Sequence, residues 1–443
     1  MNASEQNKQN QQERVIPKLR FPEFQTALGW ENRPLSTVFN RITLKNKENN
    51  QNVLTISAQY GLISQLDFFN KSVSAKDITG YYLLHKGDFA YNKSYSNGYP
   101  YGAIKPLKLY DKGVVSTLYI CFKLKESYSN YGNFFEHYFE AGVQNNDIGK
   151  VAQEGARNHG LLNIGIQEFF NEVNVLIPSF EEQQKIADCL SSLDELIELQ
   201  EQKLAALKQH KKGLMQQLFP SHNDLQASKQ ASKQASKQAS KQASKIVYPK
   251  LRFPQFRNCK GWEVVELRNV GYFVKEKMEV INLEPPNYIS TENLLSDYGG
   301  VTASNKLPTT EKVTAYKKND ILVSNIRPYL KKVWQADKNG GASNDIIIIR
   351  AKPSINISFL SFAIKNDDFI DYMMKGAKGV KMPRGDLNLI SIFPVAVPTS
   401  PKEQQAIADC LSSLDNLINE QNERIGRLKT HKKGLMQQLF PNI

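Results

Sequence analysis

The chain has 443 residues, of which 40% are hydrophobic, so it can bury the cores of two or three domains. It has no apolar run long enough to span a membrane, and its four cysteines form no C-x-x-C pair, which argues against a disulfide framework and suits a reducing cytoplasm. The net charge of +13, of which the five lysines of one short repeat supply 5, favours a polyanionic partner.

The N-terminal residues are polar and rich in Gln and Asn, so we expect residues 1–16 to be disordered. They contain no hydrophobic segment of the kind that a secretory signal needs, so we expect a cytoplasmic location and no association with a membrane. A first globular part is expected over residues 17–180. It opens with PKLRFPEF at Pro17–Phe24, and Gly-Trp-Glu follows at Gly29–Glu31.

The chain contains an internal duplication, which determines how the rest of it is interpreted. PKLRFPQF at Pro249–Phe256 repeats the opening motif 232 positions later. Between Glu182–Pro220 and Glu403–Pro441, 28 of 39 positions are identical, whereas residues 25–180 and 257–401 share only scattered landmarks. The repeated segments are nearly identical, while the globular parts between them differ. This pattern indicates that the two globular parts recognise two different targets. Drift after an old duplication is the alternative, but drift would not spare one segment and rewrite its neighbour.

The repeated segments predict two long helices, at residues 181–220 and 402–441, each ended by a proline. Apolar residues recur at alternating spacings of four and three, which is the pattern of a coiled-coil seam. About 36 residues at about 1.5 Å each would make a rod of about 55 Å. The predicted seam consists of Ile186, Leu190, Leu193, Ile197, Leu204 and Leu207 in the first helix and Ile407, Leu411, Leu414, Ile418, Ile425 and Leu428 in the second.

Because both helices belong to one chain, we expect them to pair with each other. The short path from Pro220 into the second globular part, residues 249–401, would carry that part to the far end of the first helix. The second helix must then run back, so we predict an intramolecular antiparallel coiled coil that holds two globular parts apart. Cys189 and Cys410 would lie near opposite ends and form no disulfide. A parallel zipper between two copies of the chain is the structural alternative.

The linker at residues 221–248 contains ASKQASKQASKQASKQASK, at Ala227–Lys245. Ala, Lys and Gln favour a helix, but the repeat has no apolar stripe to bury, so we expect a solvated, partly helical tether. If helical, each copy adds about 6 Å and rotates the chain beyond it by roughly 40°. DNA advances about 3.4 Å per base pair, so one copy would change the reach by less than about two base pairs. A flexible linker whose length has no effect is the alternative.

Both globular parts contain stretches that resemble nucleic-acid-contacting loops, in which polar and basic side chains could bond base edges or phosphates. The candidates are Asn92, Lys93, Ser94, Tyr95, Asn97 and Lys105 in the first part and Ser324, Asn325, Arg327, Lys331 and Lys332 in the second. A second basic stretch adds Arg157 and Asn158 in the first part and Lys378, Lys381 and Arg384 in the second. A solvated turn is the alternative for any one of them. The apolar runs at residues 116–122 and 345–351 predict buried strands behind these loops.

No motif for catalysis is found in the sequence. The stretch Glu284–Tyr288 has the wrong order for the Asn/Asp-Pro-Pro-Tyr motif of methyltransferases and is expected to be a turn. No phosphate-cradling glycine loop occurs, and the six histidines have no metal-ligand spacing. We therefore expect a reader of nucleic acid without catalytic residues, metal or cofactor.

The duplicated plan, the P-K-L-R-F-P entry, the E-Q-Q-x-I-A-x-x-L-x-x-L-D helix start and the K-K-G-L-M-Q-Q-L-F-P exit resemble the specificity subunit of type I restriction–modification systems. The resemblance covers the chain from Pro17 to Pro441. It implies an α+β fold in which two DNA target recognition domains, residues 17–180 and 249–401, are held apart by the two helices. Each domain would read one half of a split double-stranded DNA target.

The same resemblance implies partners. In this family the helices bind two methyltransferase subunits, and motor–nuclease subunits join the full complex. Adenine methylation and ATP-dependent cleavage belong to these partners, which agrees with the missing motifs. Tandem repeats after the first helix also occur in the family, where their copy number alters the gap between the half-sites.

Two other functions remain open. A stand-alone bipartite regulator would bind operator DNA tightly by itself. A coiled-coil adaptor between proteins would show no salt-sensitive binding to DNA. A chain that carries its own methylation or cleavage domain is disfavoured by its length and by the missing motifs.

Overall fold

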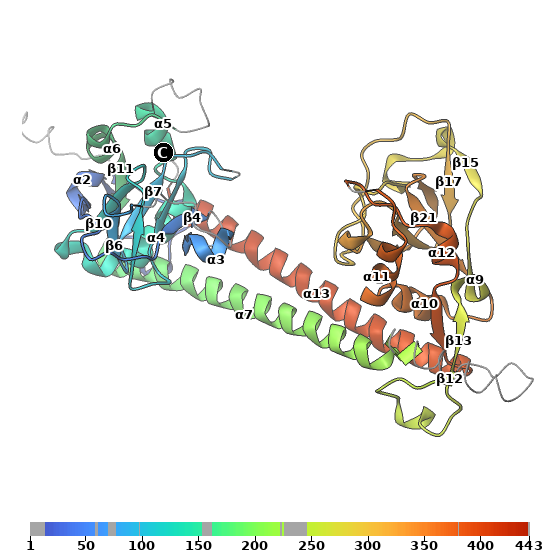
Figure 1. The fold of residues 1–443 in the computed structure, drawn as a ribbon. Helices are drawn as coiled ribbons and strands as arrows, with labels where there is room; N and C mark the ends of the chain where they lie inside the picture. The colour runs from blue at the N-terminus through green and yellow to red at the C-terminus, as the bar shows by residue number, and fades with distance from the viewer. Residues whose placement is uncertain are drawn as a thin grey trace, which may run out of the picture. The chain divides into compact units, whose positions relative to one another are not determined.

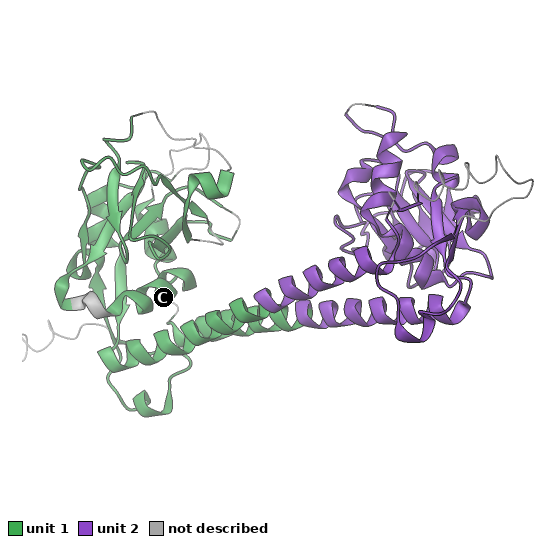
Figure 2. Ribbon diagram, turned by 60° about the horizontal axis from the view of Figure 1, so that its bottom comes forward, with its two compact units in different colours: residues 1–201, 423–443 green, residues 202–422 purple. Residues whose placement is uncertain are grey.

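The computed structural model describes most of the chain, namely residues 14–57, 61–69, 77–96, 98–152, 162–221, 224–225, 246–379 and 381–441. The chain divides into two compact units (Figure 2). Unit 1 contains residues 1–201 and 423–443, and unit 2 contains residues 202–422. The helices α7 (Phe180–Leu218) and α13 (Pro401–Leu439) therefore each contribute one half to each unit.

Two boundaries expected from the sequence are corrected by short strands. Arg14–Val15, placed in a disordered tail, form strand β1, which pairs with Glu31 and Trp30. Ile246–Val247, placed in the linker, form strand β12, which pairs in the same way with Glu263 and Trp262. The ASKQ copies and the first 13 residues lie outside the described residues.

Unit 1 combines small antiparallel sheets with short helices (Figure 1). One sheet has the order β1, β2 (Trp30–Pro34) and β11 (Asn174–Ile177), and another has the order β3 (Phe39–Arg41), β10 (Ile120–Leu124), β7 (Phe89–Asn92) and β8 (Ala103–Pro106). Two strand pairs complete it, β4 (Leu54–Ser57) with β5 (Gly61–Ser64) and β6 (Tyr82–His85) with β9 (Lys112–Val115). Among its described residues, the helices besides α7 and α13 are α2 (Leu35–Val38), α3 (Gln65–Phe69), α4 (Gly132–Ala141), α5 (Asn145–Val151) and α6 (Ile166–Glu172), with 3-10 turns at Pro22–Phe24 and Glu126–Tyr131.

Unit 2 repeats this plan with different loops. Its first sheet has the order β12, β13 (Trp262–Glu266) and β22 (Pro394–Val397), and its second has the order β14 (Gly271–Phe273), β21 (Ile346–Ala351), β18 (Ile321–Ser324) and β19 (Val333–Gln335). A third sheet has the order β15 (Lys277–Glu279), β17 (Lys312–Tyr316), β20 (Gly340–Ala342) and β16 (Tyr288–Ile289). The short helices are α9 (Leu267–Val270), α10 (Ile357–Ile364), α11 (Asp367–Lys375) and α12 (Leu387–Ser391), with 3-10 turns at Val280–Asn282, Pro254–Phe256, Pro285–Asn287 and Pro328–Leu330.

The strand register extends the duplication to the globular parts, where the two sequences share only scattered landmarks. In unit 1 Phe122 of β10 lies opposite Phe89 of β7, and in unit 2 Ile349 of β21 lies opposite Ile321 of β18. Strands β7 and β18 both lie in the middle of a four-stranded sheet, and each leads into the first predicted DNA-contacting loop of its unit. The strand expected at residues 116–122 begins only at Ile120, because residues 116–119 form a turn closed by the Tyr119 N–H on the Ser116 carbonyl.

In each unit, an aromatic residue that follows a long helix packs into the hydrophobic core. In unit 1 Phe440, just after α13, packs edge-on against Trp30 and lies next to Phe134. In unit 2 Phe219, just after α7, packs the same way against Trp262 and next to Phe359. The repeated Leu-Phe-Pro exit motif thus supplies one large apolar anchor to each unit, and such aromatic pairs stabilise a core beyond the area that they bury.

The halves of α7 and α13 that share a unit lie side by side (Figure 1). In unit 1 Asp194 accepts two bonds of 2.6 Å from the Lys432 ammonium, and Glu201 pairs with Lys429 at 2.6 Å. The residue numbers rise along one helix while they fall along the other, so these halves run in opposite directions. In unit 2 Lys211 pairs with Asp415. All the predicted seam residues are buried or half-buried. No helix in the described part of the chain is long and apolar enough to cross a membrane.

Candidate nucleic-acid interface

Three loops of unit 2 are joined through their backbones. The Arg327 N–H donates to the Pro383 carbonyl at 3.0 Å, and residues 378 and 384 exchange backbone bonds of 2.9 and 3.0 Å. The N–H groups of Asp297 and Tyr298 donate to the carbonyls of Leu330 and Lys331. We call residues 294–302, 325–332 and 376–386 the unit 2 loop cluster, without Val380, which is not described. It gathers every predicted contact residue of unit 2 other than Ser324, which lies at the end of β18.

Within and beside this cluster some predicted DNA contacts are already engaged inside the protein. Ser324 is 2% exposed, and its hydroxyl donates to the Ile326 carbonyl at 2.9 Å. The Lys332 ammonium donates to the Thr291 carbonyl at 2.7 Å. Lys331 pairs with Asp367 at 2.8 Å, and this hydrogen bond raises the pKa of the lysine. We therefore assign these three side chains to holding the loops together.

The remaining cations of the cluster are exposed. Arg384 pairs with Asp345 at 2.9 Å and Lys378 lies 3.9 Å from Asp386, but exposed ion pairs contribute only about 0–1 kcal/mol. Such pairs can be exchanged for a phosphate at little cost. Arg327 and Lys381 are exposed as well. This surface is thus positive and accessible, as binding to a phosphate backbone requires.

The corresponding loops of unit 1 are described only in part. Asn92 accepts the Ser94 N–H at 3.1 Å, and the Lys93 carbonyl accepts the Leu162 N–H at 3.0 Å, which joins two loops here as well. The side chain of Tyr95 is 64% exposed. Asn97, Arg157 and Asn158 lie outside the described residues.

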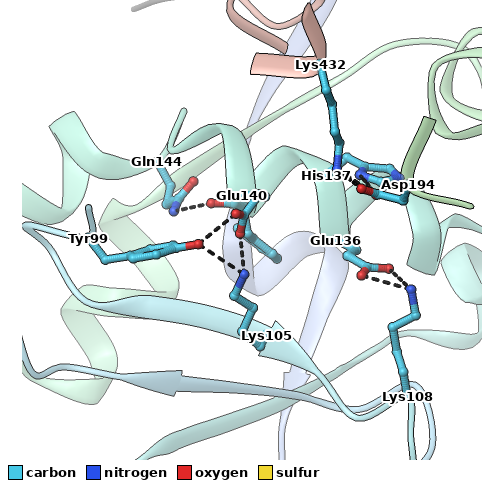
Figure 3. Close-up of polar contacts among 10 residues, drawn as sticks. Tyr99, Lys105, Lys108, Glu136, His137, Glu140, Gln144, Asp194 and Lys432 are labelled. Carbon is cyan, nitrogen blue, oxygen red and sulfur yellow. Dashed lines mark hydrogen bonds and ion pairs between the residues drawn. The ribbon is translucent and has the colours of Figure 1, made fainter. Parts of the chain in front are cut away.

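Lys105 is a candidate DNA contact from the sequence, but in the structure its side chain lies beside Tyr99 and Glu140 (Figure 3). Its ammonium pairs with Glu140 of α4 and lies 3.3 Å from the hydroxyl of Tyr99, and the side chain is only 13% exposed. Burial, together with Glu140, raises the pKa of Tyr99 above its ordinary value. We assign Lys105 to the framework of unit 1 rather than to DNA.

Helix α4 also connects the first globular part to both long helices (Figure 3). His137 is 3% exposed, and its Nε2 lies 3.0 Å from the Ser191 hydroxyl of α7. Its Nδ1 lies 4.0 Å from Asp194, which is held by Lys432 of α13. Burial, with a further contribution from Lys432, lowers the pKa of His137 to about 4, so the ring is neutral at pH 7.

A buried ion pair that sequence reasoning missed fixes the entry motif of unit 1 to α7. Nε and Nη2 of Arg20 bond the two carboxylate oxygens of Glu182 at 2.7 and 2.6 Å. The Trp30 indole N–H donates to the same carboxylate at 3.2 Å, and the guanidinium also reaches the carbonyls of Ala27 and Leu28. Bidentate, charge-assisted bonds of this kind are among the strongest polar contacts in proteins.

Unit 2 contains the same arrangement. Arg252 bonds both oxygens of Glu403 at 2.7 Å, and Trp262 donates to that carboxylate at 3.0 Å. We call the two arrangements the Arg–Glu–Trp latches. The preceding leucine binds the other long helix, because Leu19 N–H donates to the Gln438 carbonyl and Leu251 N–H to the Gln217 carbonyl, both at 2.9 Å. The signal was present in the sequence, since all these residues belong to the repeated motifs.

The latches and the unit 2 loop cluster are polar, but their described residues do not form a metal centre. In the part of the chain that the structure describes, no three His, Cys, Asp or Glu side chains lie close enough together to hold a metal ion.

Comparison with known proteins assigns the chain to one protein family. A family model described as type I restriction modification DNA specificity domain matches residues 28–209 and again residues 259–428. The chain belongs to this family. The two matches fall on the two copies of the duplicated plan, and each contains one globular part and most of one long helix.

Individual relatives agree with this assignment. The putative type I restriction enzyme MjaX specificity subunit of Methanocaldococcus jannaschii is 24% identical over 315 residues, which cover 66% of this chain and 64% of that protein. The type I restriction enzyme MjaVIII specificity subunit of the same organism is 22% identical over 287 residues, which cover 62% of this chain and 63% of that protein. The matched part of the chain thus spans less than two thirds of either relative.

The fold is also found in a solved structure. The crystal structure of the S subunit of a type I restriction–modification system from M. genitalium has a TM-score of 0.51 at 16% identity. The match covers 97% of this chain and 100% of that chain. At this identity the likeness concerns the fold alone.

Proposed function

We propose that this chain is the DNA sequence-specificity subunit of a type I restriction–modification complex. The observation that carries the proposal is the duplicated unit, in which the same frame presents a different polar loop surface each time. Exposed cations on the unit 2 loop cluster and the net charge of +13 fit a polyanionic ligand. Membership of the DNA specificity domain family supports the same conclusion.

Each unit would read one half of a split target. The frames are alike, but the reading loops differ, because unit 1 presents Tyr95 where the 232-residue offset places Arg327 in unit 2. The two half-sites should therefore differ in sequence. Phosphate contacts would orient each unit on the duplex, while a few side chains would bond base edges in the groove.

The two long helices would set the distance between the half-sites. The antiparallel ion pairs in unit 1 and the buried or half-buried seam residues support an intramolecular antiparallel coiled coil. The repeat linker would then adjust the gap. Because both readers are tethered, binding of one raises the effective concentration of the other only at the correct spacing.

The same helices would recruit two methyltransferase subunits, and through them the motor–nuclease subunits. Leu199 of α7 is 59% exposed and Leu417 of α13 is 48% exposed. The partners would flip an adenine and methylate it, while this chain would contribute binding and position but no catalytic group.

DNA binding at several salt concentrations tests this proposal. We expect the purified chain with its two methyltransferase subunits to bind a target duplex, and the affinity to fall steeply with salt because counterions are released. Tight operator binding by the chain alone would favour the regulator instead. Salt-insensitive or absent DNA binding by the complex would favour the adaptor.

A further inference from the structure

Arg327 occupies a backbone conformation that its residue type disfavours. Its φ of 50° and ψ of 61° lie in the left-handed region, where a Cβ is crowded and glycine is favoured. Pro328 follows directly, and a proline biases the residue before it towards an extended conformation. The position is held because Arg327 N–H donates to the Pro383 carbonyl and its own carbonyl accepts the Leu330 N–H at 2.9 Å. The loop thus keeps an arginine where glycine would fit with less strain.

Lys331 offers a comparison within the same loop. It has a φ of 54° and is also left-handed, but its ammonium pairs with Asp367 and so anchors the loop to α11. The guanidinium of Arg327 has no such partner, since it forms no hydrogen bond, ion pair or ring contact with any residue that the structure describes. The internal packing therefore accounts for the side chain of Lys331 but not for that of Arg327.

The surroundings of Arg327 match the edge of a base better than a phosphate. Tyr329 is 50% exposed and Met382 is 49% exposed, so the guanidinium lies on a loop surface that also presents apolar groups. Among the other exposed cations of the cluster, Lys378 and Lys381 are lysines, which bind phosphate as point charges. Arg384 differs from Arg327 because it already pairs with a carboxylate, that of Asp345, which a phosphate could replace. A guanidinium is the group whose fork of N–H donors fits the O6 and N7 acceptors of guanine.

We propose that Arg327 reads a guanine in the half-site recognised by unit 2, donating two hydrogen bonds to its O6 and N7 in the major groove. Lys378, Lys381 and Arg384 then hold the flanking phosphates. Tyr95 occupies the corresponding position in unit 1, so that position of unit 1 presents no guanidinium. This inference rests on the proposed function and adds to it a base and the residue that reads it.

Methylation sequencing of charge-conserving variants tests the proposal in the full chain, expressed with its methyltransferase partners. In the wild type, one half-site contains an invariant guanine. With Arg327→Lys, which keeps the charge but loses the fork, we expect methylation at sites with another base there to rise about tenfold relative to the guanine sites. The other half-site and the gap stay the same. Arg268→Lys, at an exposed position of unit 2 paired with Glu266, leaves the whole motif unchanged.

Arg327→Gly provides a second readout. Glycine adopts the left-handed conformation without strain, but it also makes the unfolded chain more flexible, and these two effects oppose each other. We therefore expect this variant to unfold within about 5 °C of the wild type and to lose the preference for guanine. A much larger drop in the unfolding temperature would mean that the side chain serves the fold, and would overturn the proposal. An unchanged motif in both Arg327 variants would overturn it as well while leaving the specificity role intact. If the wild-type chain directs no methylation motif, the proposed function itself fails, and the inference fails with it.

Discussion

At the residue scale, the Arg–Glu–Trp latches are buried bidentate ion pairs in both units. The side chains of Arg20 and Glu182 are 5% and 1% exposed. Glu182→Gln should lower the free energy of unfolding of unit 1 by about 3–5 kcal/mol, because it leaves a guanidinium buried without a counter-charge. Urea unfolding followed by tryptophan fluorescence measures this change, since Trp30 lies against the latch.

An exposed ion pair on the same two segments provides the control. Lys185 pairs with Glu23 at 3.1 Å, and both side chains are about half exposed. Lys185→Gln should change the free energy of unfolding by less than about 1 kcal/mol. Equal losses in Lys185→Gln and Glu182→Gln would show that the latch has no special role.

His137 should make the stability of unit 1 depend on acidity. Its pKa is lowered from 6.5 to about 4 in the folded chain, so between these values the unfolded chain binds a proton that the folded chain does not. The neutral ring therefore contributes stability that is present above pH 6.5 and lost as the pH falls towards 4, by about 3 kcal/mol at most. Lys432 and Lys108 disfavour the charged ring, while Asp194 and Glu140 favour it.

Urea unfolding at pH 7 and pH 4.5 measures this dependence. In His137→Gln, which can keep a hydrogen bond to Ser191, the loss of stability on acidification should be smaller than in the wild type. His431→Gln, at an exposed position of α13, should leave it unchanged. If His137→Gln lost as much stability on acidification as the wild type does, other groups would cause the acid sensitivity.

At the scale of elements, charge explains why the halves of α7 and α13 pair as they do. Residues 180–201 carry seven acidic side chains and one basic one, whereas residues 423–439 carry five basic side chains and one acidic one. Antiparallel pairing brings the acidic half of α7 and the basic half of α13 together in unit 1. It likewise places residues 202–218, which have four lysines and no acid, with the acidic start of α13 in unit 2.

An exchange of charges tests this pairing. Lys432→Asp should destabilise unit 1 by about 1 kcal/mol, because it faces Asp194 with a like charge, and the added change Asp194→Lys should restore most of the loss. A double-mutant cycle measures the coupling between the two positions. A coupling of zero would contradict the pairing seen in unit 1.

How much the sequence predicts also differs between elements. The long helices could be placed within two residues, since α7 ends at Leu218 rather than at residue 220, because their signal is periodic and local. The residues of the latches all belong to repeated motifs, but their pairing could not be predicted, because Arg20 and Glu182 lie 162 positions apart and neither motif alone identifies the partner. The sequence also could not distinguish candidate side chains that are free to contact DNA from those that are engaged inside the protein. Lys105 and Arg327 look alike as sequence, and only the tertiary position of Glu140 shows that Lys105 is engaged.

At the scale of the whole molecule, the repeat linker should act on the gap between the half-sites and on nothing else. Inserting or deleting one ASKQ copy should change the unspecified gap of the methylated motif by less than about two base pairs, because a helical copy adds about 6 Å. Both half-sites should stay the same, since neither reading surface changes. Sequencing of methylated DNA for each copy number measures this. An unchanged gap would identify the linker as a flexible tether whose length has no effect.

The central claim is that this chain decides where its partners methylate DNA. Single-molecule methylation sequencing of host DNA, with and without the gene for this chain, tests it most directly. We predict a split methylated motif, with a fixed unspecified gap between its halves, that disappears when the gene is deleted and returns when it is restored. If every methylated motif persists without the gene while the partner methyltransferase is present and active, the chain does not specify the target and the central claim is wrong.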